Sequence, residues 1–342
     1  MILVFVGAGG SAAVDPEQYP TTVEFFSRLP DNIKKDPLFF QVCEFLKIQK
    51  DEQPIDIEEI LWTLDELATL RHRCLSVCDP KKIFGWLLHD RMSGILTEAT
   101  NIIASFLHQM NGSGWNKIEN LKDDINALVY DLYATPPDKD KLSNWVQLLQ
   151  GLVQYDSNIE IFTTNYDRVL EQVIDVGKIN LETGLKSNVD SLILDTSIWD
   201  TPGVPYNNHG RLTKLHGSVN WQRSNDGIII SNPIFTGNHQ QHSILYPGYK
   251  GVPNEEPFTK FHEHLQAVVQ QASAAIFIGY AFRDDYINTI LSELPSEIPK
   301  FVINKDDALP DFSFLDECQH LKNGLTEESV NIFPGPIRPS RA

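Results

Sequence analysis

Cysteine is scarce in this sequence of 342 residues, and the few cysteines have no metal-site or redox spacing. The four cysteines are Cys43, Cys74, Cys78 and Cys318. A zinc ribbon or a redox-active dithiol needs a closely spaced pair such as C-x-x-C, and none occurs. The sequence therefore favours reduced, mostly buried thiols in a cytoplasmic protein, with no structural disulfide.

Histidines do not replace the missing cysteines as metal ligands. The group considered is His239, His242, His262 and His264. His262 and His264 are two residues apart on a predicted helix, so they point to different faces and cannot share one ion. We therefore predict no metal site.

Lys and Arg are also few compared with Asp and Glu. The chain has 28 Lys and Arg against 46 Asp and Glu, which gives a formal net charge of −18. Nucleic-acid-binding proteins present a basic face to phosphates, and no stripe of Lys or Arg stands out here. We expect no direct nucleic-acid contact. An anionic ligand would be held by backbone N–H groups and helix N-termini instead.

Long apolar runs are absent as well. No segment has 18 uninterrupted apolar residues, so the sequence predicts no membrane-spanning helix. The apolar start MILVFVGAGGSAA is too short to cross a membrane and lacks the basic region of an export signal. A hydrophobic fraction of 42% and a charged fraction of 22% are typical of globular proteins. We expect a soluble, cytoplasmic protein.

What the sequence does contain is β-prone runs in two separate parts of the chain. Ile2–Val6 is a continuous apolar run, as expected for a strand buried on both faces of a parallel sheet. Further strands are predicted at 158–163, 192–194, 212–215, 227–230, 243–246, 274–278, 300–303 and 329–333, with helices at 166–174, 257–271 and 284–294. This alternation predicts an α/β fold with a Rossmann-like, doubly wound parallel sheet.

The segment between these parts shows helical periodicity alone. Apolar residues recur at three- and four-residue spacing over 39–48, 57–74, 83–110, 118–133 and 142–153. A short helix is also predicted at 22–29, and Asp51 or Asp56 can cap the helix at 57–74. We therefore predict an α/β domain formed by residues 1–30 and 155–335, with a large all-helical insertion over residues 31–154.

The first motif with chemical meaning is Gly7-Ala8-Gly9-Gly10-Ser11, directly after the first strand. Glycine at this place lets the backbone turn sharply and approach a phosphate without a Cβ in the way. Ser11 adds a hydroxyl donor. The third glycine of G-x-G-x-x-G is missing. The motif predicts a dinucleotide phosphate site, with a tight strand–helix turn as the alternative.

Two polar motifs follow later strands. Asn165 and Asp167, in I-F-T-T-N-Y-D, come at the carboxyl end of a predicted strand, where open α/β sheets bind ligands. They can orient sugar hydroxyls or a carboxamide, or simply cap the next helix. His216, in L-H-G-S, can accept a proton from a hydroxyl or water near neutral pH. A packed, hydrogen-bonded structural histidine is the alternative.

The last two motifs also stand at strand ends. G-Y-A-F-R-D-D runs from Gly279, and its Asp284 suits a helix N-terminus because of the helix dipole. Asn304 follows the strand at 300–303 and can hold a ribose hydroxyl or form a turn.

Taken in order, the five motifs resemble the sirtuin-like family, and more narrowly its bacterial branch that destroys NAD⁺ in antiphage defence. They lie at 7–11, 163–167, 215–218, 279–284 and 303–304, so the resemblance spans nearly the whole chain. D-I-E-E-I-L-W-T-L at 56–64 also resembles a helical segment of such proteins. The resemblance implies an NAD⁺ hydrolase that uses NAD as substrate, cleaves the nicotinamide–ribose bond to give nicotinamide and ADP-ribose, and needs no metal.

The resemblance also implies roles for single residues. Asn165 and His216 match the family's catalytic asparagine and histidine, and Asp167 matches the acid near the carboxamide. Gly7, Ala8, Gly9 and Ser11 match the loop that binds the pyrophosphate of NAD⁺. Gly279, Tyr280 and Asp284 match the segment that flanks the phosphates and the adenosine ribose, and Asn304 matches a contact of the adenosine ribose. Thr164, beside the asparagine, is a further predicted NAD-binding position.

The sequence departs from sirtuin deacylases in several places. No cysteine lies between Cys78 and Cys318, so the four-cysteine zinc module is missing, and with it the expected acyl-lysine groove. Thr164 and Ala281 stand where the family usually has Gln and Ser. An NAD-dependent deacylase or ADP-ribosyltransferase is one alternative function, and a non-catalytic NAD⁺ or ADP-ribose sensor is another. Retention of Asn165 and His216 argues against a sensor.

The resemblance finally implies partners. The resemblance suggests a homo-oligomer. Because NAD⁺ destruction without restraint would kill the host, we expect the helical insertion, the oligomer interface or a partner protein to restrain the activity. A defence partner such as a HerA-type ATPase is a further expectation.

Overall fold

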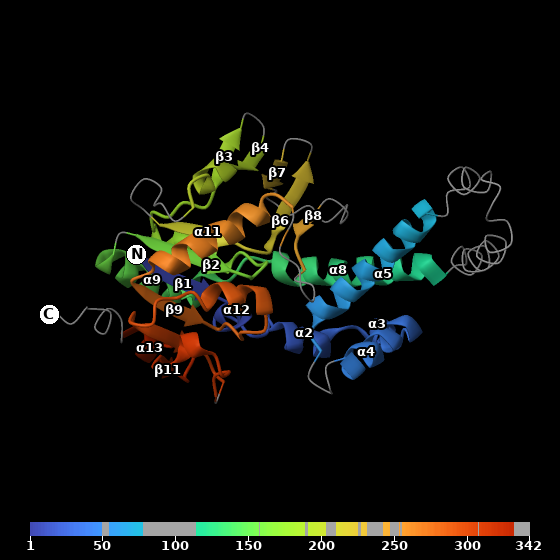
Figure 1. The fold of residues 1–342 in the computed structure, drawn as a ribbon, viewed down its shortest axis with the longest axis horizontal. Helices are drawn as coiled ribbons and strands as arrows, with labels where there is room; N and C mark the ends of the chain where they lie inside the picture. The colour runs from blue at the N-terminus through green and yellow to red at the C-terminus, as the bar shows by residue number, and fades with distance from the viewer. Residues whose placement is uncertain are drawn as a thin grey trace, which may run out of the picture. The chain divides into compact units, whose positions relative to one another are not determined.

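The computed structural model describes residues 1–49, 55–77, 114–156, 158–188, 191–202, 210–224, 227–230, 242–246, 253, 255–306 and 308–331 (Figure 1). The chain divides into two compact units. One consists of Met1–Glu24 and Val129–Ala342, and the other of Phe25–Leu128.

The first unit is built on a six-stranded sheet. In spatial order the strands are β11 (Gln319–Leu321), β10 (Lys300–Ile303), β9 (Ala274–Ile278), β1 (Ile2–Val6), β2 (Ile159–Thr163) and β5 (Arg211–Lys214). All neighbouring strands pair in parallel. The chain moves outward from β1 in one direction through β2 and β5, and in the other through β9, β10 and β11. This confirms the predicted doubly wound parallel sheet of an α/β fold.

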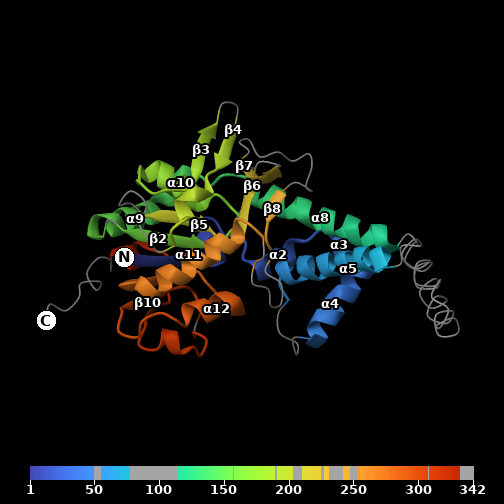
Figure 2. The same cartoon turned by 45° about the horizontal axis from the view of Figure 1, so that its top comes forward.

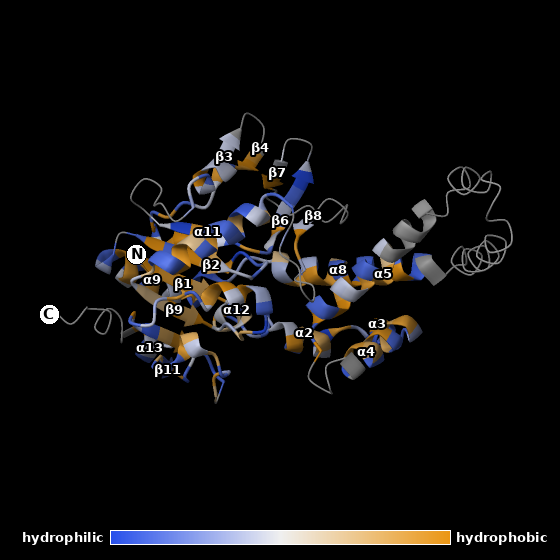
Figure 3. Cartoon of the chain, viewed as in Figure 1, coloured by the Kyte–Doolittle hydropathy of each residue, from blue (hydrophilic) through white to orange (hydrophobic). Residues whose placement is uncertain are grey.

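The pairing register brings the central strands to a common end. Val6 of β1 pairs with Thr163 of β2 on one side and with Ile278 of β9 on the other. All five residues of β1 are fully buried, as the continuous apolar run predicted. Figure 3 shows hydrophobic colour along β1 and β9. Because parallel strands share a direction, the segments after them emerge at one edge of the sheet.

Helices cover this sheet. Those of the first unit are α1 (Ala8–Ala12), α9 (Ser143–Tyr155), α10 (Val169–Gly177), α11 (Phe258–Gln271), α12 (Asp285–Leu291) and α13 (Glu327–Asn331), with short 3-10 turns η1 (Lys139–Leu142), η2 (Thr196–Trp199) and η4 (Ser313–Leu315). Two further helices, α2 (Thr22–Arg28) and α8 (Gly114–Ala134), contribute residues to both units.

The main core lies between the sheet and α11 with α12. Phe5 of β1 and Phe277 of β9 join Phe261 and Leu265 of α11 in one cluster of buried side chains. Trp145 of α9 donates a hydrogen bond from its indole to the carbonyl of Gly10 (2.9 Å), which anchors α9 to the segment after β1. Figure 2 shows α9 and α11 on either side of the strands.

A second sheet was not predicted. It has five strands in the order β3 (Leu185–Asn188), β4 (Ser191–Leu194), β7 (Gly227–Ile230), β6 (Gly217–Ser224) and β8 (His242–Ile244). Its neighbours are antiparallel. Several of these short strands were predicted from the sequence, but they were not predicted to form a second sheet separate from the parallel one. Their strands are three to eight residues long, and only tertiary pairing decides their partners.

Two local predictions were wrong. The run at 329–333 is not a strand, because Glu327–Asn331 forms α13. Thr326 and Ser329 exchange hydrogen bonds between side chain and backbone N–H (2.8 and 3.3 Å), and this cap starts a helix. Within the described residues, the last strand of the chain is β11, at the edge of the sheet. The glycine segment 7–11 was expected as a loop, but α1 begins at Ala8, immediately after β1.

The second unit is helical within its described residues. It contains α3 (Asp31–Lys34), α4 (Pro37–Gln49) and α5 (Ile57–Val77), together with the first part of α8. Asp56 caps α5, because its carboxylate accepts from the Glu59 N–H and the Glu59 carboxylate accepts from the Asp56 N–H, both at 3.0 Å. Lys122 of α8 forms an ion pair with Asp65 of α5. The helix expected at 83–110 lies outside the described residues.

In the part of the chain that the structure describes, every helix is too short or too polar to cross a lipid bilayer.

Candidate functional site

The sequence-predicted site residues lie after five strands of the parallel sheet, at its carboxyl edge. Along this edge, Asn304 follows β10, Gly279 follows β9, the 7–11 segment follows β1, Asn165 follows β2 and His216 follows β5 by one residue. The direction of winding reverses between β1 and β9, and open α/β sheets bind ligands at such a switch point.

The segments after β1 and β9 are in backbone contact. The N–H of Gly9 donates to the carbonyl of Gly279 (2.9 Å), and the N–H of Gly7 donates to the carbonyl of Ile278 (3.0 Å). A Cβ on Gly9 would lie 2.8 Å from the Cα of Gly279, and a Cβ on Gly279 would lie 2.1 Å from the nitrogen of Gly10. Gly279 also has a positive φ of 58°. These glycines are therefore required for close packing of two chain segments, whether or not a phosphate binds there.

Asn165 is fixed by the segment after β1. Its Nδ2 donates to the carbonyl of Gly7 (2.9 Å) and to the hydroxyl of Ser11 (2.8 Å), so both amide hydrogens are used. Its backbone N–H donates to the hydroxyl of Thr163 (3.0 Å). The side chain is buried. The amide oxygen, which receives no hydrogen bond from the described residues, is the group left to a ligand.

Asp167 makes the capping contact that the sequence offered as one of two roles for it. Its carboxylate accepts from the N–H of Val169 (2.9 Å) at the start of α10, so it acts as a helix cap. Burial raises the pKa of Asp167, and the Lys214 charge and the Ser11 hydroxyl only partly offset this. Ser11 thus lies between Asn165 and Asp167 and connects them.

His216 faces a carboxylate from the other side of the site. Its Nε2 is 3.6 Å from an oxygen of Asp284, and the imidazole is only 3% exposed. Asp284 is itself held as the cap of α12, because it accepts from the N–H of Ile287 (2.9 Å). Burial raises the pKa of Asp284, but the hydrogen bond and charge of His216 outweigh it and hold that pKa below its usual value.

The second ring nitrogen of His216 is an orphan. Nδ1 is buried, and within the described ranges it has no hydrogen-bond partner. Buried polar atoms are nearly always paired in native proteins, so each exception requires an explanation.

Sequence reasoning missed the surroundings of His216. The ring of His262 on α11 stacks against it, with centroids 6.4 Å apart and planes at 19°. The Nδ1 of His262 is 2.9 Å from the carbonyl of Phe258, and burial lowers the pKa of His262 to about 4. The sequence offered one signal, which is that His262 falls four residues after Phe258 on the apolar face of a helix.

His264 has separate partners from His262. It is fully buried, and its Nε2 is 3.0 Å from the Glu160 carboxylate of β2. Among the described residues there is no group of three or more His, Cys, Asp or Glu side chains placed to hold a metal ion.

The remaining predicted residues serve internal contacts. The ring of Tyr280 packs in the core against Phe5 (centroids 4.5 Å), and its hydroxyl is 3.3 Å from Oδ1 of Asn288. Asn304 forms a turn, in which its Oδ1 accepts from the backbone N–H of Asp306 (3.3 Å) and lies 2.6 Å from Nε2 of His320. The N–H of Thr164 donates to the carbonyl of Val6 (3.3 Å).

The structure thus brings the predicted residues together in two groups. One is joined by direct contacts around the β1–β2–β9 edge and contains Gly7, Gly9, Ser11, Asn165, Asp167 and Gly279, with Ala8 and Thr164 on the same segments. The other is the pair of His216 and Asp284. In the described part of the chain, Asn304 makes no hydrogen bond to either group.

Comparisons with known proteins give a family match over part of the chain. Residues 159–323 match a family model described as SIR2-like domain, a segment that runs from β2 to just beyond β11. The search of curated proteins gives no match.

Solved structures similar to this chain include two of the Sir2 type. A mutant of Sir2 homologues in complex with 2′-O-acetyl ADP-ribose is 12% identical with a TM-score of 0.44, and the alignment covers 100% of this chain and 94% of the other. A structure described as the structural basis for the mechanism and regulation of Sir2 enzymes is 10% identical with a TM-score of 0.36, covering 96% and 90%. The predicted sirtuin-like resemblance therefore holds in its coarse form: residues 159–323 of this chain are similar to the SIR2-like domain family.

Proposed function

We propose that this chain binds NAD⁺ at the carboxyl edge of its parallel sheet and hydrolyses the nicotinamide–ribose bond. The match of residues 159–323 to a SIR2-like domain supports an NAD-dependent activity. The contact of Asn165 with Gly7 beside the switch point of the sheet supports this edge as the site, and His216 follows the outer strand β5 at the same edge.

The single observation that carries the proposal is the environment of His216. Its Nε2 faces the Asp284 carboxylate at 3.6 Å, and its buried Nδ1 has no partner among the described residues. With the hydrogen on Nε2, Nδ1 keeps its lone pair and can accept a proton from water. A carboxylate behind an imidazole also stabilises the imidazolium that forms. A buried nitrogen without a hydrogen-bond partner lowers the stability of the fold by about 1–3 kcal/mol. A histidine with a purely structural role would not explain this loss.

The proposed reaction follows from these groups. Nicotinamide leaves the ribose carbon as a neutral base, and positive charge develops on the sugar. The free amide oxygen of Asn165 holds the water or a ribose hydroxyl beside that carbon. The water oxygen bonds to the carbon, and Nδ1 of His216 takes its proton. The products are nicotinamide and ADP-ribose, and the proton passes from His216 to solvent.

The contacts of the glycine segment refine the predicted dinucleotide contacts. The N–H groups of Gly9 and Gly10 already donate to the carbonyls of Gly279 and Gly7. We therefore assign direct pyrophosphate contact to the backbone at Ala8. Ser11 acts by holding Asn165 and Asp167 in place.

The experiment is incubation of the purified full chain with NAD⁺, followed by chromatography of nicotinamide and ADP-ribose. The wild type is expected to release both, whereas Asn165→Ala and His216→Ala lower the rate by about 10²–10⁴-fold. Asn323→Ala, an exposed asparagine bonded only to Glu328 within the described chain, is the matched control and keeps the wild-type rate. Protection of the protein from heat by NAD⁺ without any product would contradict hydrolysis and favour the sensor alternative.

A role in antiphage defence is the finer part of the proposal. Its support is the order of the five motifs in the sequence and the harm that unrestrained NAD⁺ loss does to a cell. We propose a homo-oligomer whose activity is released together with a partner such as a HerA-type ATPase. Light scattering of the purified chain tests the first point, since a monomer at micromolar concentration contradicts it. Co-purification from cells that express both proteins tests the second, and recovery of the chain alone contradicts it.

A further inference from the structure

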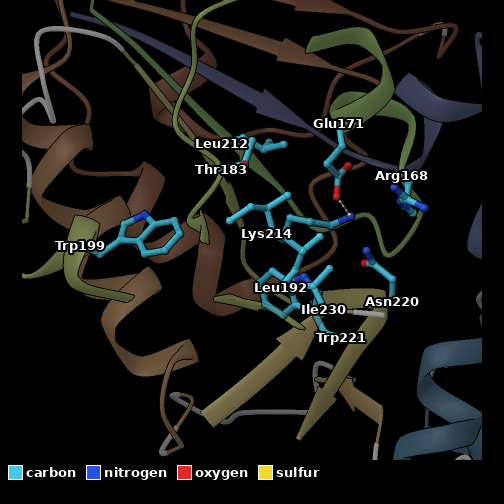
Figure 4. A pocket seen from close by; sticks show the side chains of 11 residues that line it. Arg168, Glu171, Thr183, Leu192, Trp199, Leu212, Lys214, Asn220, Trp221 and Ile230 are labelled. Carbon is cyan, nitrogen blue, oxygen red and sulfur yellow. Dashed lines mark hydrogen bonds and ion pairs between the residues drawn. The ribbon is translucent and has the colours of Figure 1, made fainter. Parts of the chain in front are cut away.

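A pocket whose lining residues differ from those of the proposed NAD⁺ site lies between the edge strand β5, the start of α10 and the antiparallel sheet (Figure 4). It contains about 550 Å³ of empty space, part of which is open to solvent. None of the residues assigned to NAD⁺ above lines it. Arg168 and Lys214, which do, are close in sequence to Asp167 and His216.

Most of the lining is hydrophobic and includes two flat aromatic side chains. Trp199 and Trp221 are both buried, and the other apolar lining residues are Leu185, Leu192, Leu212 and Ile230. Apolar and aromatic walls with a few placed polar groups are typical of small-molecule sites. Walls of this kind favour a planar ring.

The polar groups gather at one end in the view of Figure 4. There the Lys214 ammonium donates to one oxygen of Glu171 (3.0 Å) and to the backbone carbonyl of Asp167. The second oxygen of Glu171 and the amide oxygen of Asn220 are buried, and neither has a partner among the described residues. Asn220 is 95% buried, since only 5% of it is exposed. Two buried acceptors without donors indicate that a ligand supplies N–H groups here.

We propose that this pocket binds an adenine base, as part of a nucleoside or nucleotide. The exocyclic amino group of adenine carries two hydrogens. It can therefore donate one hydrogen bond to each of the two acceptors without partners, on Glu171 and Asn220. A carboxamide is also the side chain that pairs with adenine through both its oxygen and its nitrogen. The lining has two cations, Arg168 and Lys214, against the single carboxylate of Glu171, so a phosphate attached to the base is tolerated.

The test is titration of the full-length protein with adenosine, without NAD⁺, followed by calorimetry and tryptophan fluorescence. Saturable binding is expected, with quenching from the tryptophans of the pocket. Inosine has a carbonyl in place of the amino group, so it is expected to bind about tenfold to a hundredfold more weakly. Equal affinity for the two nucleosides, or no binding of adenosine, overturns the proposal. Titration with AMP distinguishes a nucleotide from a nucleoside as the natural ligand. Tighter binding of AMP than of adenosine assigns a nucleotide, and equal binding assigns a nucleoside.

Two variants separate this pocket from the edge of the parallel sheet. Asn220→Leu has a similar volume and removes an orphan acceptor, so its Tm is expected to stay the same or rise while adenosine affinity falls at least tenfold. Asn304→Ala is the comparison variant, since Asn304 is the residue predicted to contact the adenosine ribose of NAD⁺, and its affinity for adenosine is expected to stay within twofold of the wild type. Loss of binding in Asn304→Ala but not in Asn220→Leu places adenosine at the other site and overturns the proposal.

If Asn220→Leu does not fold, Glu171→Gln tests the same point, because it removes one acceptor and keeps the shape of the side chain. Its adenosine affinity is then expected to fall at least tenfold, and an unchanged affinity overturns the proposal. These outcomes do not depend on whether the chain hydrolyses NAD⁺, since they measure binding of a nucleoside without it.

Discussion

Arg211 forms an almost fully buried ion pair with Glu160, and its replacement by Met is expected to destabilise the fold strongly. Arg211 of β5 and Glu160 of β2 are register partners in the parallel sheet, and their side chains are 1% and 0% exposed. Nε and Nη2 of Arg211 donate to the carboxylate at 3.0–3.2 Å. Nη1 donates to the carbonyl of Ile198 (2.6 Å).

The magnitude follows from what Arg211→Met leaves behind. Among the described residues, the carboxylate of Glu160 then keeps His264 as its hydrogen-bond partner, at 3.0 Å, and burial lowers the pKa of that histidine, which disfavours the charged form that could balance the carboxylate. Removing one partner of a buried ion pair typically costs about 3–5 kcal/mol, because an uncompensated charge remains. We therefore expect Arg211→Met to lose about that much free energy of unfolding.

Urea denaturation followed by circular dichroism measures the loss. The double variant Glu160→Leu with Arg211→Met is the control, since replacing both partners by apolar groups removes the uncompensated charge and recovers most of the stability. A loss below about 1 kcal/mol in the single variant would refute the reasoning. So would a double variant that is no more stable than the single one.

Three further predictions concern the site. Burial lowers the pKa of His262 to about 4. Below about pH 6.5 this histidine is therefore protonated in the unfolded chain but not in the folded chain, so the free energy of unfolding falls as pH falls from 6.5 towards 4. Between pH 7 and pH 5 the loss in free energy of unfolding is about 2 kcal/mol, and His262→Phe should lose less than the wild type by that amount in urea titrations at the two pH values. An equal loss in the two proteins contradicts the prediction. Gly279→Ala is expected to fold poorly, since its Cβ would meet the nitrogen of Gly10 at 2.1 Å at a φ of 58°, and a Tm within a degree of the wild type contradicts this packing. Asp284→Asn is expected to lower kcat for NAD⁺ hydrolysis at least tenfold with little change in KM, and an unchanged kcat argues against its pairing with His216.

The parallel sheet was predictable because its strands are buried on both faces. The predicted strands at 274–278 and 300–303 coincide with β9 and β10, and Ile2–Val6 coincides with β1. Such strands form continuous apolar runs that a sequence displays directly. The strand β6 mixes buried polar and apolar residues, so no run marked it, and the antiparallel sheet that it joins was not foreseen.

The site was predictable as a set of segments, but not as a set of contacts. Motif order located Asn165 and His216 at strand ends, as the structure places them. The contact of His216 with Asp284 joins residues far apart in sequence, across two intervening strands, and nothing local encodes it. Likewise, the pairing of Asn304 with His320 depends on how β11 docks beside β10.

The most direct test of the central claim is the amount of nicotinamide and ADP-ribose formed from NAD⁺ by the wild type and by His216→Ala. The account predicts equal molar amounts of both products from the wild type and a rate lower by about 10²–10⁴-fold from the variant at the same folded concentration. Equal rates from the two proteins would contradict the role of His216, and no products from a folded wild type that binds NAD⁺ would contradict hydrolysis itself.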